Sequence, residues 1–372
     1  MRVAIQASDL DHSRIDGTRV YLRELLKRFG DIAPDTDFVL YHKSSFNPLL
    51  APPNFPQYDV KTKPFPYAWM QTRFAWEMFR QRPDKLFLPI QAAPVVMPQG
   101  IEVTATIHDL AFRRFPETFP KSHLWKLNFM LETAVKRADK LIAVSQSTKN
   151  DLLEFFPHIP ADKIRVIHHG FDREFFGTRL SDAVISETLK TFHLQLSSYI
   201  LYVGALQPRK NLVRLIRAFE QMKAHAPEAK LVLAGEEAWL SQEIIDTWEM
   251  TPSRDDIVLP GRVSFDVLRT LYQGARCFAF PSLYEGFGLP ILEAFASGVP
   301  VLTAANSSLS EVAGDGALYC QAEDVSDIAE KLEQLWNDDA LRQDLIAKGS
   351  VRLNHFSWDR CASETLQYIL HP

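Results

Sequence analysis

Two glutamates flank a glycine-containing loop in the segment PSLYEGFGLPILEAFASGVPV. Glu285 lies before the loop, and Glu293 follows with seven residues in between. Gly286 and Gly288 let backbone N–H groups approach a ligand, and a helix predicted to start at Pro290 adds its positive dipole end, which together predict an anion site. One carboxylate can accept hydrogen bonds from sugar hydroxyls and the other from ribose hydroxyls. The alternative makes Glu293 a helix-dipole partner and Glu285 a solvated loop residue.

A basic pair occurs in the segment YVGALQPRKNLVRLIRAF, after a predicted strand that ends at Gly204. Arg209 and Lys210 precede a predicted helix for which Asn211 is placed as the N-cap. The planar fork of an arginine and the point charge of a lysine suit a diphosphate. An isolated Arg-Lys pair is more often a solvated basic turn. The parallel placement on a second strand–loop–helix unit favours the binding interpretation.

A histidine directly follows another predicted strand in the segment EVTATIHDLAF. This position predicts that His108 faces a cleft, where it can hydrogen-bond a sugar hydroxyl or steady a reaction centre. The alternative is a buried histidine whose hydrogen bonds are satisfied within the protein, and Asp109 caps the next turn. Gly17, in SRIDGTRVYLRELL, precedes the first predicted helix, and its amide can approach a phosphate.

Short β-rich runs alternate with helical patterns, which predicts an α/β fold with parallel sheets covered by helices. The length of 372 residues suits two domains, and the pattern restarts after residues 171–198, which contain no clear strand. We therefore infer two Rossmann-like domains facing a central cleft. The predicted strands are Arg2–Ala7, Phe38–Tyr41, Leu86–Leu88, Val103–Ile107, Leu141–Val144, Arg165–Ile167, Tyr199–Val203, Leu231–Ala234, Ile257–Leu259, Cys277–Phe280, Val301–Thr303 and Leu318–Cys320.

Composition excludes several classes of protein. Hydrophobic residues make up 46% and charged residues 23%, as in ordinary globular proteins. A net charge of −5 argues against a general nucleic-acid binder. The three cysteines are odd in number and lack metal-ligand spacing, so we expect a reducing compartment. We expect neither a signal peptide, because the N-terminus turns polar within seven residues, nor a membrane span, because no run of about 18 apolar residues occurs.

An aromatic and basic stretch, PFPYAWMQTRFAWEMFRQRPDK, occupies residues 64–85. As a surface helix it would meet an anionic membrane or a lipid-linked acceptor. We favour the alternative, in which the helix faces the core and Arg73 pairs with Glu77 at helical spacing.

Other patterns are weak as metal or cofactor sites, and we expect neither a metal nor a bound cofactor. Two Asp-x-Asp triplets, at residues 9–11 and 35–37, match a metal pattern that is common by chance, and the second lies in a Pro-containing turn. The Gly-Phe-Gly triplet lacks the third glycine of a dinucleotide fingerprint. The His168-His169 pair has no ligand partner nearby in the sequence.

Taken together, these segments resemble the retaining glycosyltransferases of family four, which have the GT-B fold. The resemblance runs along nearly the whole chain and extends to TIHDLAFRRFPETF, ADKLIAVSQSTKNDL, IRVIHHGFD, FPSLYEGFGLPILEA and FSWDRCA. The fold implies an acceptor-side domain at residues 1–180, a nucleotide-sugar domain at 195–354 and a terminal helix, 357–372, that packs back on the first domain.

The resemblance also implies roles for the motif residues. Arg209 and Lys210 would hold the diphosphate, with Gly17 by the phosphate and Gly204 among the other donor-binding residues. Glu285 would bind the donor sugar beside His108. The remaining contacts would come from the Glu293 carboxylate to ribose, from backbone groups at Arg262 and Val263 to the base, and from the backbone N–H groups of Phe287, Gly288 and Leu289.

The implied activity is retaining transfer of a hexose by a cytoplasmic enzyme. The sequence looks most like bacterial mannosyltransferases of surface-polysaccharide assembly, so we expect GDP-mannose as the nucleotide-sugar donor and a glycan or lipid-linked acceptor. Peripheral contact with the inner membrane surface stays open, whereas nucleic acid is not expected. The alternatives are a transferase that uses a UDP- or dTDP-sugar, a GT-B nucleotide-sugar epimerase, and a sugar-nucleotide-binding protein without catalysis.

Overall fold

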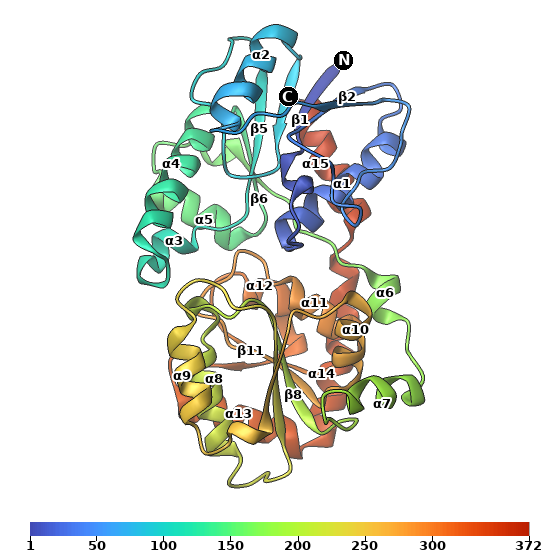
Figure 1. Cartoon of the computed structure of the whole chain (residues 1–372), viewed down its shortest axis with the longest axis vertical. Coiled ribbons are helices and arrows are strands. Elements are labelled where there is room, and N and C mark those ends of the chain that lie inside the picture. The colour runs from blue at the N-terminus through green and yellow to red at the C-terminus, as the bar shows by residue number, and fades with distance from the viewer. Residues whose placement is uncertain (372) are drawn as a thin grey trace. The chain divides into compact units, whose positions relative to one another are not determined.

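A computed structural model describes residues 1–371, which form two compact units (Figure 1). Unit 1 contains Met1–Arg113, Ser122–Gly170 and the C-terminal segment that begins at Phe356. Unit 2 contains Phe171–His355 together with the short segment Arg114–Lys121. The chain therefore enters unit 2 twice, and its last helix belongs to the same unit as its first strand.

Unit 1 is built on a seven-stranded parallel sheet of order β3-β2-β1-β4-β5-β6-β7. Its strands are β1 (Arg2–Gln6), β2 (Asp37–His42), β3 (Tyr58–Thr62), β4 (Lys85–Leu88), β5 (Glu102–Ile107), β6 (Lys140–Ala143) and β7 (Ile164–Val166). Its helices are α1 (Gly17–Ile32), α2 (Ala75–Gln81), α3 (Ala111–Arg114), α4 (Lys121–Arg137), α5 (Gln146–Phe155) and α15 (Trp358–Leu370). Helix α3 ends at the first residue of the segment that belongs to unit 2, and α4 begins at its last residue.

Unit 2 is built on a six-stranded parallel sheet of order β10-β9-β8-β11-β12-β13. Its strands are β8 (Tyr199–Val203), β9 (Lys230–Ala234), β10 (Ile257–Gly261), β11 (Cys277–Phe280), β12 (Val301–Ala304) and β13 (Ala317–Cys320). Its helices are α6 (Arg173–Gly177), α7 (Asp182–Lys190), α8 (Leu212–Met222), α9 (Gln242–Met250), α10 (Phe265–Gly274), α11 (Leu289–Ala296), α12 (Leu309–Ala313), α13 (Val325–Asn337) and α14 (Asp339–Arg352).

The α/β fold with parallel sheets is confirmed, and every predicted strand is present. One strand, β3, was not predicted. It lies at the edge of its sheet with the sequence YDVKT, in which Tyr58 is buried and Asp59 and Val60 are exposed. Because an edge strand has one solvated side, it lacks the continuous apolar run of the central strands.

The sheet of unit 2 changes direction between β8 and β11. From β8 the chain proceeds outward to β9 and β10, and it then returns to place β11 on the other side of β8. Because β8 and β11 are parallel neighbours, the loops that follow them leave the same edge of the sheet. Such a switch point is where open parallel sheets bind ligands.

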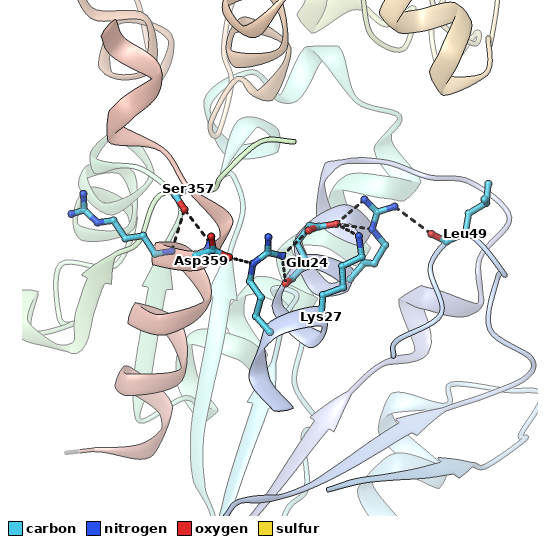
Figure 2. A network of polar contacts seen from close by, with 8 residues as sticks. Glu24, Lys27, Leu49, Ser357 and Asp359 are labelled. Carbon is cyan, nitrogen blue, oxygen red and sulfur yellow. Dashed lines mark hydrogen bonds and ion pairs between the residues drawn. The ribbon is translucent and has the colours of Figure 1, made fainter. Parts of the chain in front are cut away.

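The first and last helices of unit 1, α1 and α15, lie side by side and are joined by an ion pair between their side chains (Figure 2). The buried Glu24 on α1 contacts Arg23, Lys27 and Arg28, and Arg28 reaches Asp359 on α15 at 2.5 Å. Ser357 caps α15 by accepting from the backbone N–H groups of its first turn. This network ties the C-terminus of the chain to its N-terminal helix.

The aromatic stretch at residues 64–85 divides between core and surface. Trp69 and Phe74 are buried, and Arg73 pairs with the buried Glu77 at 2.7 Å, as the core-facing interpretation predicts. Trp76, by contrast, is 61% exposed, so that interpretation is wrong for this side chain. None of the helices in residues 1–371 is long and apolar enough to cross a membrane.

Candidate donor site

A cluster of three charged side chains lies where β8 and β11 end. Glu285, in the loop after β11, accepts from Arg209 Nη1 at 2.9 Å through Oε2 and from Lys210 Nζ at 2.5 Å through Oε1. Arg209 and Lys210 form the turn that follows β8. Glu285 is buried, so its interpretation as a solvated loop residue is wrong.

Both cations of the cluster act on the carboxyl of Glu285. Burial alone would raise the pKa of the Glu285 carboxyl, but Lys210 and Arg209 outweigh it and lower that pKa to about 2. One carboxylate thus faces two cations in a largely buried site. Two cations held side by side suit an anion such as a phosphate, because the surroundings screen charge poorly.

The basic turn is fixed to the neighbouring loop by main-chain contacts. Arg209 Nη1 donates to the carbonyl oxygen of Tyr284 at 2.5 Å, and the N–H of Leu283 donates to the carbonyl oxygen of Arg209 at 3.0 Å. Asn211 has a left-handed backbone with φ 64°. Asn211 does occupy the N-cap position of α8, but its side chain makes no capping bond. Its amide instead donates to the carbonyl oxygen of Pro281 at 2.9 Å and thereby holds the two loops together.

A third loop, after β12, supports the glutamate from the other side. The fully buried hydroxyl of Ser308 lies 2.9 Å from the carbonyl oxygen of Glu285 and 2.8 Å from that of Phe287. The hydroxyl oxygen of Ser307 accepts from the N–H of Glu285 at 3.0 Å. Sequence reasoning missed these serines. The available signal was that they lie in the loop after β12, the strand beside β11.

The predicted helix after the glycines is present, with one small correction. Helix α11 begins at Leu289, so Pro290 is its second residue. Gly288 precedes the helix with φ 107°, a conformation that strains any residue with a Cβ. Gly298 ends the helix with φ 71°, as predicted for its C-terminal cap. The backbone N–H groups of Phe287, Gly288 and Leu289 thus lie at the positive end of α11.

Glu293 lies one turn further along α11, and a phenol holds it in place. The hydroxyl of Tyr272 donates to Glu293 Oε2 at 2.9 Å. Burial raises the pKa of Glu293 to about 7, and the bond from Tyr272 opposes that rise. As the fifth residue of the helix, Glu293 lies beyond the first turn, where the helix dipole acts. The dipole interpretation is therefore poorly supported.

The remaining predicted residues of unit 2 follow the strands β8 and β10. Gly204 follows β8 with φ 151°, and a Cβ there would approach the hydroxyl oxygen of Tyr202 to 2.6 Å. Arg262 and Val263 connect β10 to α10, with the Arg262 side chain exposed. All of these residues therefore lie near the carboxyl ends of strands.

The two predicted residues of unit 1 follow β1 and β5. His108 donates from Nε2 to the carbonyl oxygen of Pro89 at 2.7 Å, and burial lowers its pKa. The ring is therefore neutral, and its Nδ1 is a hydrogen-bond acceptor. The alternative, in which the hydrogen bonds of a buried histidine are satisfied within the protein, holds for Nε2. Gly17 is the first residue of α1, and the side chain of Asp16 caps that helix by accepting from the N–H of Arg19.

The carboxylates of the Asp-x-Asp triplet at residues 9–11 are used within unit 1. Asp11 accepts from the backbone N–H groups of Lys43 and Ser44 at 2.7 and 2.8 Å and also contacts His42. In residues 1–371, no group of three or more His, Cys, Asp or Glu side chains is arranged to hold a metal ion.

Family models match both halves of the chain. Residues 192–352 match the family "Glycosyl transferases group 1", and residues 15–175 match "Glycosyltransferase Family 4". O-antigen chain mannosyltransferase B of Escherichia coli is 31% identical over 272 residues, which span 73% of this chain and 71% of the relative. The serotype-specific mannosyltransferase WbdA of Escherichia coli is 31% identical over 232 residues, but these span 61% of this chain and 28% of that longer protein.

Solved structures show the same fold at lower identity. The Anabaena protein HepE, in complex with UDP and glucose, aligns with a TM-score of 0.76 at 18% identity and 99% coverage of both chains. WaaG, a glycosyltransferase involved in lipopolysaccharide biosynthesis, aligns with a TM-score of 0.75 at 14% identity and 100% coverage of both chains. With the two family matches, these results show that the chain is a glycosyltransferase of the GT-B fold and belongs to family 4, the group 1 glycosyltransferases.

Proposed function

We propose that the chain transfers mannose from GDP-mannose to a glycan or lipid-linked acceptor during surface-polysaccharide synthesis. Relatives named as O-antigen chain mannosyltransferases, in Escherichia coli and Salmonella typhimurium, support the sugar and the pathway class. The observation that carries the transferase site is the buried cluster in which Arg209 and Lys210 share the carboxylate of Glu285. We place this activity on the cytoplasmic side of the membrane.

We assign the donor diphosphate to Arg209 and Lys210, with Gly204 and Gly17 near the phosphates. The two cations attract the diphosphate, and Glu285 holds both of them in position before the diphosphate arrives. Glu285 then also accepts hydrogen bonds from hydroxyls of the donor sugar. Since the amides of Phe287, Gly288 and Leu289 point from a helix start, they add hydrogen-bond donors toward the same anion.

The nucleoside is assigned to the neighbouring strand ends. Glu293 accepts from the ribose hydroxyls, and Tyr272 fixes its carboxylate for that contact. Backbone groups at Arg262 and Val263 bind the base. His108 accepts a donor-sugar hydroxyl at Nδ1, because Nε2 already donates to a carbonyl oxygen. In this scheme residues 195–354 bind the donor, and residues 1–180 with the terminal helix 357–372 bind the acceptor.

The roles of the residues in the reaction follow from the charges that develop on the sugar and on the departing diphosphate. As the bond between the anomeric carbon and the phosphate oxygen breaks, the sugar gains oxocarbenium character and the diphosphate gains negative charge. Arg209 and Lys210 stabilise that leaving group as preorganised donors, each worth about 3 kcal/mol in comparable sites. The acceptor hydroxyl attacks from the leaving-group face, and its proton passes to the departing phosphate. The configuration at the anomeric carbon is retained.

A UDP-sugar is the second candidate donor, because the similar HepE structures hold UDP, UDP with glucose, and UDP-glucose. A thermal-shift screen of GDP-mannose, UDP-glucose, ADP-glucose and dTDP-rhamnose separates the candidates, since a bound ligand stabilises the fold by mass action. We expect selective stabilisation by GDP-mannose and a mannosylated product that forms only with acceptor.

Three other outcomes would contradict the proposal. Selective stabilisation by UDP-glucose, with glucosyl transfer, would replace mannose as the sugar. Conversion of the donor without any acceptor would indicate an epimerase. Tight donor binding without turnover over a panel of glycan and lipid-linked acceptors would indicate a binding protein.

A further inference from the structure

The segment Arg114–Lys121 belongs to unit 2, although the chain before and after it belongs to unit 1. It begins six residues after His108 in the sequence, and its centre is a 3-10 turn at Pro116–Thr118. The hydroxyl of Thr118 donates to the carbonyl oxygen of Phe115 at 2.7 Å and stiffens the turn. The contacts of this turn with the rest of unit 2 raise the question of what it does there.

Trp239 holds the far end of the segment. Its indole Nε1 donates to the carbonyl oxygen of Thr118 at 2.9 Å. The ring of Phe119 lies against the same indole, with centroids 5.5 Å apart and planes inclined by 31°. Hydrogen bonding and ring packing therefore act together on two adjacent residues.

Both contacts of the segment are with loops that adjoin the cluster of Arg209, Lys210 and Glu285. Trp239 lies in the loop after β9, whose residues Glu236 and Ala238 hydrogen-bond Leu206, three residues before Arg209. At its other end, the ring of Phe115 lies 6.2 Å from that of Tyr284, the residue before Glu285. The segment thus contacts the loop that carries the carboxylate and a loop that is hydrogen-bonded to the one carrying the cations.

We propose that Trp239 is a positioning residue for glycosyl transfer, which latches the segment Arg114–Lys121 against the loops that follow β9 and β11. The latch keeps water away from the anomeric carbon of a bound donor and fixes the chain that follows His108. This inference rests on the proposed function. Without the latch, water competes with the acceptor: its oxygen bonds to the anomeric carbon, the diphosphate leaves, and a proton passes to solvent.

Trp239→Phe tests this role because it removes the indole N–H and keeps a ring beside Phe119. Trp248→Phe is the matched control, since Trp248 makes the same kind of bond in unit 2, to the carbonyl oxygen of Ile257 at 3.3 Å. We expect Trp239→Phe to lower kcat for transfer about fivefold, as for loss of one hydrogen bond. The fraction of donor that is hydrolysed should rise in that variant and not in the control.

A second measurement does not depend on catalysis. Hydrogen–deuterium exchange at the amides of Thr118 and Phe119 should be faster in Trp239→Phe than in the wild type and Trp248→Phe. Equal exchange in all three proteins, or an unchanged ratio of hydrolysis to transfer in an active Trp239→Phe enzyme, would overturn the latch. Absence of transfer by the wild type with every donor would instead remove the proposed function, while the exchange result would still decide whether Trp239 holds the segment.

Discussion

Arg209 and Glu285, which are separated by 75 residues in the sequence, form a buried ion pair with 2.9 Å between Nη1 and Oε2. The same guanidinium nitrogen donates to the carbonyl oxygen of Tyr284. A side chain that binds both the carboxylate and the backbone of the opposite loop fixes where Glu285 points. The arginine is therefore as much a structural partner of the glutamate as a cation for the donor.

Glu285→Gln should destabilise the protein by about 3 kcal/mol, because it removes the buried carboxylate charge that Arg209 and Lys210 share. A nucleoside diphosphate supplies that missing charge, so GDP should raise the melting temperature of Glu285→Gln more than that of the wild type. Glu187→Gln, which breaks an exposed pair with Lys190, is the control and should change stability little. An equal shift by GDP in wild type and Glu285→Gln would contradict the diphosphate assignment.

Donor binding should depend on pH through Glu293. With a pKa near 7, its carboxyl is half ionised at neutral pH, and the ionised form is the stronger acceptor for ribose hydroxyls. Donor affinity should therefore increase from pH 6 to pH 8, and isothermal titration should find this dependence absent in Glu293→Gln. A wild-type affinity that is flat over this range would remove the ribose role.

The raised pKa of Glu293 also makes the stability of the donor-free protein depend on pH, and this stability falls over the range in which donor affinity should rise. Because the folded-state pKa of Glu293 lies above its ordinary value of 4.5, the stability from its neutral form is complete below pH 4.5 and is lost as pH rises through about 7.

Tyr272→Phe removes the hydrogen bond that favours ionisation of Glu293, so it should move the pH midpoint of donor binding to higher pH. A midpoint that moves downward would show that Tyr272 does not stabilise the carboxylate.

Ser308→Ala should reduce transfer about tenfold without unfolding the protein, since one buried hydrogen bond to the loop of Glu285 is lost. The effect should fall on kcat and on donor KM together, because the loop holds both sugar and diphosphate contacts. Ser297→Ala is a matched control, as this buried hydroxyl has no hydrogen-bond partner within residues 1–371. Equal kinetics for the two variants would show that the serine does not position the loop.

The two carboxylates of the ion network between α1 and α15, Glu24 and Asp359, should contribute unequally to the stability of the protein (Figure 2). Glu24→Gln leaves three cations around a buried site and should cost about 3 kcal/mol, whereas Asp359→Asn alters a side chain that is 84% exposed and should cost below about 1 kcal/mol. Chemical denaturation measures both values. Similar losses would mean that the exposed Asp359 does more to tie the terminal helix than its environment indicates.

Much of the fold could be predicted because buried parallel strands are written as apolar runs, as in Tyr199–Val203 and Cys277–Phe280. The candidate site was found from the residue types in the loops after those strands. The pairing of Arg209 with Glu285 could not be predicted. It depends on the order of the strands in the sheet, and local sequence patterns do not encode strand order. Ser308 and Trp239 were not predicted, since their roles depend on carbonyl oxygens of distant segments.

Transfer by Lys210→Ala is the most direct test that the basic pair binds the donor diphosphate. Arg209 still pairs with Glu285 in this variant, so the melting temperature should stay near that of the control Lys223→Ala, which loses a pair with Asp256 in the same unit. With GDP-mannose and an acceptor, kcat should fall by about 10²–10³-fold. A folded Lys210→Ala protein that transfers sugar at the wild-type rate would contradict the account.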